Sequence, residues 1–148
     1  MGSGTREIKL VVPSRIESLA FINAVAEEVA DQMKFDEEAR NAITISVVEA
    51  GTNAIQHGNK EDETLPTEVL FRQEDGQLVI LIRDAGLGFD PERIADPMAE
   101  ENMFAESGRG VYILRSFMDE VAFSFRDGVG TECRLVKVLS QPARPSNG

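Results

Sequence analysis

This sequence has a single cysteine and a deficit of positive charge. Cys133 is the only cysteine among 148 residues, which excludes an internal disulfide and suits a small apolar residue in a strand. The 26 acidic residues outnumber the 15 lysines and arginines, giving a net charge of −11. Because this charge repels phosphate backbones and anionic membranes, direct binding to nucleic acid or to a membrane is not expected. Any effect on gene expression would need a protein partner that contacts DNA.

Long apolar runs are also absent. No run approaches the roughly 20 residues that span a bilayer, and the stretch from Met1 to Arg6 lacks the apolar core of a signal peptide. These absences predict a cytoplasmic protein. The hydrophobic content of 42% is typical of a globular chain. We expect one domain over residues 1–140 and a disordered tail over residues 141–148, which contain two prolines.

Hydrophobic periodicity predicts the order β-α-α-β-β-loop-α-β-β. The predicted strands cover residues 6–12, 67–73, 77–84, 120–127 and 131–138, and the predicted helices cover 15–33, a stretch from Asp36 to Gly58, and 110–118. Asp75-Gly76 and Asp127-Gly128 lie between alternating runs, which favours two hairpins. The fold class is α+β, a two-layer α/β sandwich whose mixed, largely antiparallel sheet has helices on one face.

Three local features refine this outline. Ser14 and Asp36 precede the first two helices and are predicted to cap them. Gly51 interrupts the second helix, where a glycine costs about 0.5–1 kcal/mol relative to alanine. A close approach of another element at Gly51 would compensate for that cost.

The first candidate motif is Glu49-x-x-x-Asn53 in the second helix. Side chains four residues apart project from the same side of a helix. A carboxylate and an amide oxygen are ligands that Mg²⁺ accepts. The alternative is an ordinary solvated polar face.

The second candidate motif begins at Asp84, where a predicted strand ends. Asp84 has the parity of Ile80 and Ile82, so its carboxylate is expected on their buried face, where it needs a partner. The exocyclic amino group of a purine would serve. Gly86 and Gly88 would let a flat ligand approach the backbone. The alternative is a turn in which Asp84 accepts local backbone hydrogen bonds.

The third candidate motif is Gly108-Arg109-Gly110, immediately before a predicted helix. Backbone N–H groups at a helix N-terminus favour phosphate, and Arg109 adds a positive charge. The alternative is a flexible loop that leads into a helix.

In this order, the three motifs followed by Gly130-Thr131 resemble the nucleotide-binding boxes of the GHKL ATPases, which have the Bergerat ATP-binding fold. The stretch from Ser107 to Val121, SGRGVYILRSFMDEV, is similar to the stand-alone anti-sigma-factor serine/threonine-protein kinases. The resemblance covers about residues 6–138 and implies ATP and Mg²⁺ as cofactors.

At the adenine end, the resemblance implies a hydrogen bond from the adenine amino group to Asp84, supported by Thr131. It also implies that Gly86 and Gly88 line the adenine.

At the phosphate end, the resemblance assigns Mg²⁺ to Asn53. Glu49 would be the base that takes the proton from the acceptor hydroxyl. Gly108, Arg109 and Gly110 would lie along the phosphates, with Arg109 contributing to catalysis.

The function that the resemblance implies is a kinase and anti-sigma factor of a bacterial partner-switching system. It would sequester a sigma factor and phosphorylate a serine or threonine of a STAS-domain anti-anti-sigma antagonist, and a homodimer is also implied. The alternative is a nucleotide-gated protein-binding module with little kinase activity and a target other than a sigma factor. A fragment of a larger ATPase machine is disfavoured, because the chain ends without a transducer domain.

The segment from Phe89 to Ser107, which resembles an ATP lid, contains six acidic residues and one basic residue, Arg93. Arg109 and Mg²⁺ are therefore the main positive groups expected near the phosphates. The acidic segment is a candidate surface for a basic partner. His57 is expected to make a packing or hydrogen-bonding contact and not to accept phosphate.

Overall fold

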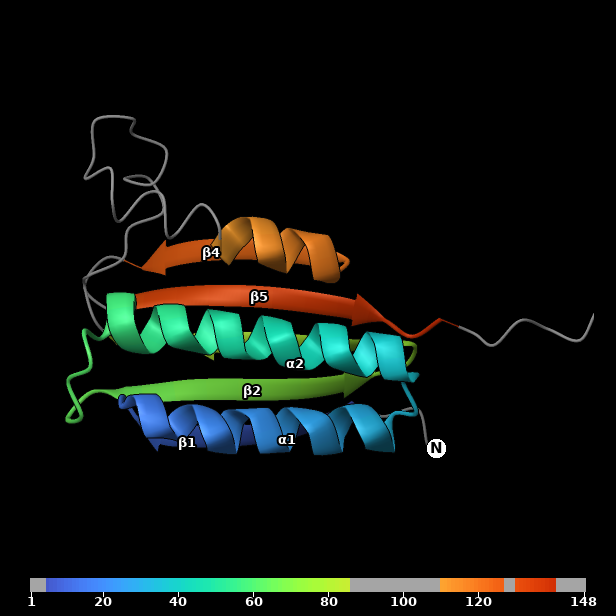
Figure 1. The fold of residues 1–148 in the computed structure, drawn as a ribbon, viewed down its shortest axis with the longest axis horizontal. Helices are drawn as coiled ribbons and strands as arrows, with labels where there is room; N and C mark the ends of the chain where they lie inside the picture. Colours follow the sequence, from blue (N-terminus) through green and yellow to red (C-terminus); the bar gives the residue numbers. More distant parts are fainter. Residues whose placement is uncertain (1–4, 86–109, 127–129, 141–148) are drawn as a thin grey trace, which may run out of the picture.

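The computed structural model describes residues 5–85, 110–126 and 130–140, which form a five-stranded sheet with helices on one face (Figure 1). Its elements are β1 (Arg6–Pro13), the 3₁₀ turn η1 (Ile16–Ser18), α1 (Leu19–Gln32), α2 (Glu37–Thr52), the π-helical turn η2 (Asn53–Gly58), β2 (Pro66–Glu74), β3 (Gln77–Arg83), a helix over residues 110–117, β4 (Glu120–Arg126) and β5 (Gly130–Val138). The predicted α+β class and element order are confirmed. The predicted tail and most of the predicted loop lie outside the described residues.

The strands are ordered β1-β2-β3-β5-β4, so β5 inserts between β3 and β4. All four strand pairs are antiparallel. The described sheet is therefore not mixed, because each of its pairs joins strands that run in opposite directions. This order puts the end of β3 beside the start of β5, where Arg83 pairs with Glu132.

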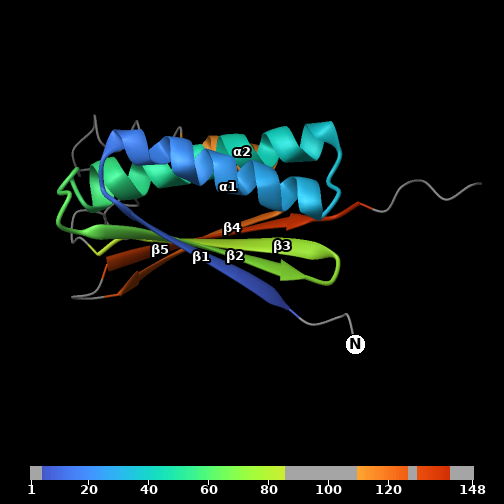
Figure 2. The same ribbon diagram turned by 90° about the horizontal axis from the view of Figure 1, so that it is seen from below.

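The main core lies between the helices and one face of the sheet (Figure 2). Strand register places Val69, Ile82 and Cys133 in one row across this face. Figure 1 shows α1 over β1 and β2, and the 110–117 helix over β4. Leu114 of that helix is fully buried, which ties it to the core.

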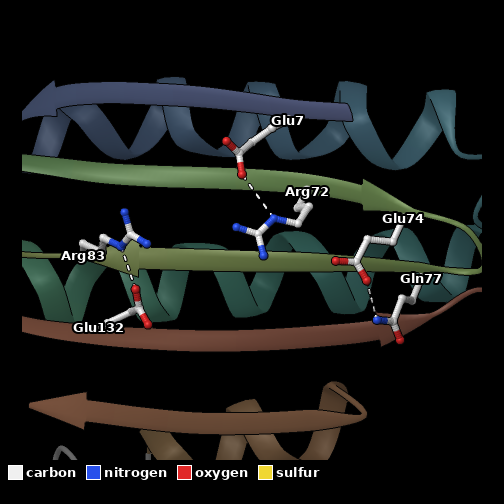
Figure 3. Close-up of polar contacts among 6 residues, drawn as sticks. All are labelled: Glu7, Arg72, Glu74, Gln77, Arg83 and Glu132. Atoms are coloured by element: carbon white, nitrogen blue, oxygen red, sulfur yellow. Dashed lines mark hydrogen bonds and ion pairs between the residues drawn. The ribbon is translucent and has the colours of Figure 1, made fainter. Parts of the chain in front are cut away.

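The other face of the sheet has a smaller apolar cluster of Leu70, Val79, Leu81 and Val136. Charged side chains form cross-strand pairs on the sheet (Figure 3). Arg83 Nε lies 2.6 Å from Glu132 Oε2, and Arg72 Nε lies 3.1 Å from Glu7 Oε2. Because long charged side chains cover apolar surface with their stems, these residues help to shield the cluster.

The two predicted helix caps have different outcomes. Asp36 is the N-cap of α2, and its Oδ1 accepts a hydrogen bond from the Ala39 N–H at 2.8 Å. The prediction that Ser14 caps the first helix was wrong. Helix α1 begins only after η1, and Ser14 Oγ instead donates a hydrogen bond to Leu65 O at 2.6 Å. Ser14 is fully buried, so a tertiary hydrogen bond replaces the local one.

The predicted close approach at Gly51 is confirmed. A Cβ atom at Gly51 would lie 3.1 Å from Leu19 Cδ2 and 3.4 Å from Ile22 Cδ1, both on α1. Glycine therefore lets α1 and α2 pack closely at this turn. Among the described residues, no helix is both long and apolar enough to span a membrane.

Candidate functional site

The end of α2 meets the start of the 110–117 helix. Glu49 lies in the last turn of α2, and Asn53 begins η2 one turn later. A Cβ atom at Gly110 would overlap with Glu49 Oε2 and would lie 3.3 Å from Asn53 Nδ2. Only glycine lets the helix begin at this position without displacing the Glu49 carboxylate. Two motifs almost 60 residues apart in the chain thus form one cluster, called here the helix cluster: Glu49, Asn53 and Gly110.

The end of β3 meets the start of β5 in a second cluster. The Asp84 N–H donates to Thr131 O at 3.0 Å, and the Thr131 N–H donates back to Asp84 Oδ1 at 3.2 Å. Both residues are buried, as the strand parity of Asp84 predicted. Because a buried carboxylate needs hydrogen-bond donors, the Thr131 N–H helps to stabilise Asp84 in this position.

Two glycines from different elements lie close to Asp84. A Cβ atom at Gly58, the last residue of η2, would overlap with Asp84 Oδ2. A Cβ atom at Gly130 would overlap with the Asp84 carbonyl oxygen, and Gly130 has a φ of +136°, which side chains rarely adopt. Asp84, Thr131, Gly58 and Gly130 are called here the strand cluster.

A small cavity connects the two clusters. Its volume is about 20 Å³, and Asn53, Asp84 and Thr131 line it together with Cys133. This volume is about that of one water molecule and is smaller than a purine. Gly86, Gly88, Gly108 and Arg109 lie outside the described residues. The structure therefore brings Glu49, Asn53, Asp84, Gly110 and Thr131 together and leaves the other four predicted site residues untested.

A much larger groove, of about 1050 Å³, lies at the opposite end of α2. Phe35, Phe117 and Leu139 are among its lining residues, and it contains no residue of either cluster. The small cavity is the better candidate site, because the buried Asp84 carboxylate and the Asn53 amide both line it.

Cys133 forms part of the apolar floor of the small cavity. Burial, followed by the negative charge of Glu132, raises the pKa of the Cys133 thiol to about 12. The thiol is therefore neutral at physiological pH and is a poor nucleophile or metal ligand. Its predicted role as a small apolar residue in a strand is confirmed.

Magnesium fits the helix cluster through its donor chemistry. The Asn53 amide supplies an oxygen ligand, and Mg²⁺ in nucleotide sites takes only one or two protein ligands beside phosphates and waters. Within the described ranges there is no group of three His, Cys, Asp or Glu side chains that would form an all-protein metal site. The donors present therefore suit a metal that arrives with a phosphate ligand.

Sequence reasoning missed two residues of this region. Gly58 and Asn59 were interpreted only as the end of a helix, yet Gly58 touches Asp84 and the Asn59 side chain accepts a hydrogen bond from Ala85 N–H at 2.9 Å. No local pattern indicates these contacts, because they join residues 26 positions apart. The only sequence signal is their place directly after the Glu49-x-x-x-Asn53 motif.

Comparison with known families identifies the fold. The family model described as "Histidine kinase-like ATPase domain" matches residues 12–137, which include both clusters. The chain belongs to this family of histidine kinase-like ATPases. The resemblance to GHKL ATPases noted in the sequence is therefore confirmed.

The chain is also similar in sequence to serine-protein kinases. It is 29% identical over 128 residues to the serine-protein kinase RsbW of Bacillus subtilis and 30% identical to that of Bacillus licheniformis. Each alignment covers 82% of this chain and 80% of the relative. The resemblance to the anti-sigma-factor kinase family is confirmed by these serine-protein kinases.

Solved structures of this ATPase fold agree with the architecture. The structure of the RsbU and RsbW domains of a Mycobacterium tuberculosis protein matches with a TM-score of 0.70 and 18% identity, covering 94% of this chain and 34% of that one. A chain of the SiaB–SiaC complex from Pseudomonas aeruginosa matches with a TM-score of 0.66 and 13% identity, covering 87% of this chain and 88% of that one. At these identities the matches show a shared fold.

Proposed function

We propose that this protein is an ATP-dependent serine/threonine-protein kinase and an anti-sigma factor of a partner-switching system. The observation that carries the proposal is the contact of Gly110 with Glu49 and Asn53, on a fold shared with serine-protein kinases. It brings a carboxylate, an amide and a helix N-terminus to one point. Phosphoryl transfer depends mainly on such positioning and on charge neutralisation.

The strand cluster would bind the base of ATP. Asp84 would accept a hydrogen bond from the adenine amino group, and Thr131 would support that contact. Asp84 suits this role because it is buried and because the Thr131 N–H and Gly58 hold its carboxylate in place. In the proposal, Gly86 and Gly88 line the same side of the nucleotide.

The helix cluster would act at the phosphates. Mg²⁺, when bound, supplies positive charge that offsets the charge of the phosphates. Asn53 would hold it through its amide oxygen, while Gly108, Arg109 and Gly110 would lie along the phosphates. Glu49 would orient the acceptor hydroxyl and take its proton as the hydroxyl oxygen bonds to the γ-phosphoryl group and ADP leaves. A base of this kind contributes about 10²–10⁴-fold to the rate.

The proposed protein partners are a sigma factor and a STAS-domain antagonist that carries the phosphorylated serine or threonine. The names of the relatives support the kinase part of the proposal, and the sequence resemblance supports the two partners. The net charge of −11 supports an effect on transcription through a protein partner instead of direct DNA contact. A cytoplasmic location and a single domain over residues 1–140 are part of the proposal. A homodimer stays a prediction that light scattering of the purified protein would test.

The experiment that tests this function uses γ-labelled ATP, Mg²⁺ and extract of the source cell. The wild type is compared with Glu49→Gln and with Glu68→Gln, a control with the same change on the outer face of the sheet, where Glu68 pairs with Lys9. We expect a newly labelled small protein with the wild type and the control but not with Glu49→Gln.

Two other outcomes would overturn parts of this proposal. Labelling by Glu49→Gln at the wild-type rate would overturn the role of Glu49. Tight ATP binding with no labelled protein would favour the nucleotide-gated binding module, whose target need not be a sigma factor.

A further inference from the structure

Asn59 is a buried amide whose side chain is hydrogen-bonded at both ends. Asn59 directly follows η2 in the chain and is 1% exposed. Nδ2 donates to Ser14 Oγ at 2.8 Å and to Pro66 O at 3.1 Å, and it lies 3.3 Å from Thr67 Oγ1. Oδ1 accepts from the Ala85 N–H at 2.9 Å. A buried network satisfied in this way specifies one arrangement of its members.

The nitrogen end of the Asn59 side chain is anchored to residues that belong to neither cluster. Ser14 and Thr67 are both fully buried, and their hydroxyl oxygens are 2.8 Å apart. Ser14 Oγ also donates to Leu65 O at 2.6 Å. The residue after the end of β1 and the start of β2 therefore form a fixed support for the Asn59 side chain.

The oxygen end of Asn59 holds the residue that follows Asp84. The Asp84 N–H is bound to Thr131 O at 3.0 Å, and the next N–H along the chain, that of Ala85, is bound to Asn59. The peptide groups on both sides of Asp84 are thus fixed from two different elements. Gly58, the neighbour of Asn59, limits the position of the carboxylate itself.

The π-helical turn explains why one segment reaches both ends of the site. Asn53 is its first residue and Gly58 its last, and the Asn59 N–H closes the turn on Ala54 O at 2.8 Å. A π-helical turn is wider than an α-helical one and is often found at functional sites. Here it connects Asn53 in the helix cluster to Gly58, Asn59 and the strand cluster.

We propose that Asn59 is a positioning residue that makes the nucleotide site selective for adenine over guanine. It holds the Asp84–Ala85 peptide so that the Asp84 carboxylate faces a donor at the purine 6-position. Adenine presents an amino group there, whereas guanine presents a carbonyl oxygen that the carboxylate would repel. This inference rests on the proposed function, because it requires that Asp84 contacts the base.

The test compares Asn59→Leu with Thr67→Val by calorimetric titration with Mg²⁺-ATP and Mg²⁺-GTP. Leucine has nearly the shape of asparagine and removes the hydrogen bond to Ala85. Valine at position 67 removes a hydroxyl from the far side of the same network and leaves the bond to Ala85 intact. Both variants should melt at a lower temperature, which makes Thr67→Val the matched control for a loss of stability.

We expect the ATP affinity of Asn59→Leu to fall about tenfold, as the loss of one buried hydrogen bond implies, with a smaller preference for ATP over GTP. Thr67→Val should keep the wild-type preference. If Asn59→Leu fails to fold, Asn59→Ser replaces it, because serine is one atom too short to reach the Ala85 N–H. An unchanged preference in the Asn59 variant, or equal losses in both variants, would overturn the inference.

The wild type separates this inference from the proposed function. A wild-type protein that binds no nucleotide overturns both. If the wild type binds ATP and GTP equally well, the inference and the contact of Asp84 with the adenine amino group are both overturned, and the kinase proposal stands. If the preference for ATP persists after Asn59 is replaced, only the role of Asn59 is overturned.

Discussion

The two clusters are built differently although a single helical segment reaches both. In the helix cluster, the backbone of Gly110 meets the ends of two side chains, Glu49 and Asn53, which lie on a half-buried surface. In the strand cluster, the backbone of Gly130 meets the backbone of Asp84. A side chain can rotate away from a new methyl group, whereas a strand in a sheet cannot move without breaking its hydrogen bonds.

This difference suits different tasks. A group that recognises a flat base benefits from a fixed position, because selectivity depends on unpaired or repelled groups in the wrong complex. A group that assists transfer to a protein substrate needs to adjust as the acceptor arrives. We therefore expect substitutions in the strand cluster to affect stability and nucleotide affinity, and substitutions in the helix cluster to affect the transfer rate.

The largest expected effect is that of Gly130→Ala. Alanine at a φ of +136° is strained, and its Cβ would overlap with the Asp84 carbonyl group. We expect a loss of about 3 kcal/mol or more in the free energy of unfolding, measured by urea denaturation. Gly76→Ala is the control, because Gly76 has a φ of +83° but no atom within 4 Å of the added Cβ. Its loss should be about 1 kcal/mol, and equal losses in the two variants would contradict the rigid strand cluster.

The next prediction compares the effects of Gly58→Ala and Gly110→Ala on ATP affinity and on the rate of phosphoryl transfer. Each methyl group would displace a carboxylate, that of Asp84 in the first variant and that of Glu49 in the second. We expect Gly58→Ala to weaken ATP binding about tenfold or more, and Gly110→Ala to slow phosphoryl transfer by a larger factor than it weakens binding. Nucleotide titration and single-turnover transfer measure the two quantities. The opposite pattern would reverse the roles assigned to the clusters.

The smallest effect concerns Cys133 below the cavity. Its pKa rises from an ordinary value of 9.0 to about 12 in the folded protein, so the folded state retains the thiol proton while the unfolded state loses it. This contribution to stability is complete below pH 9 and decreases as the pH rises toward 12. The stability advantage of the wild type over Cys133→Ala should therefore shrink by about 1 kcal/mol between pH 8 and pH 10. An advantage that stays constant over this range would contradict the burial of the thiol.

Local patterns in the sequence predict the elements well and their contacts poorly. Alternation and the Asp75-Gly76 turn predict the β2–β3 hairpin, and the parity of Asp84 predicts its buried position. Ser14 has the features of a helix cap, but burial gives it a partner on another segment, Leu65. A local sequence pattern carries no information on a tertiary hydrogen bond that competes with helix capping.

The same limit applies to the candidate site. The pairing of Glu49 with Asn53 follows from helix spacing, so the sequence predicts it. The π-helical turn that brings Gly58 and Asn59 to the end of β3 has no comparable signal, because the contacts it makes join residues 26 positions apart. The resemblance to a known family predicted that Thr131 supports the adenine contact of Asp84, which residue spacing alone does not indicate, and the hydrogen bond between Thr131 N–H and Asp84 Oδ1 was not predicted.

The division of labour between the clusters is tested most directly by one pair of matched substitutions, Asp84→Asn and Glu49→Gln. Each replaces a carboxylate with its amide, and Mg²⁺-ATP affinity is measured by calorimetry for both and for the wild type. The account predicts that Asp84→Asn weakens ATP binding about 10–100-fold through the loss of a charge-assisted hydrogen bond. Glu49→Gln should keep wild-type affinity. Equal affinity in the two variants, or weaker binding by Glu49→Gln, would contradict the account.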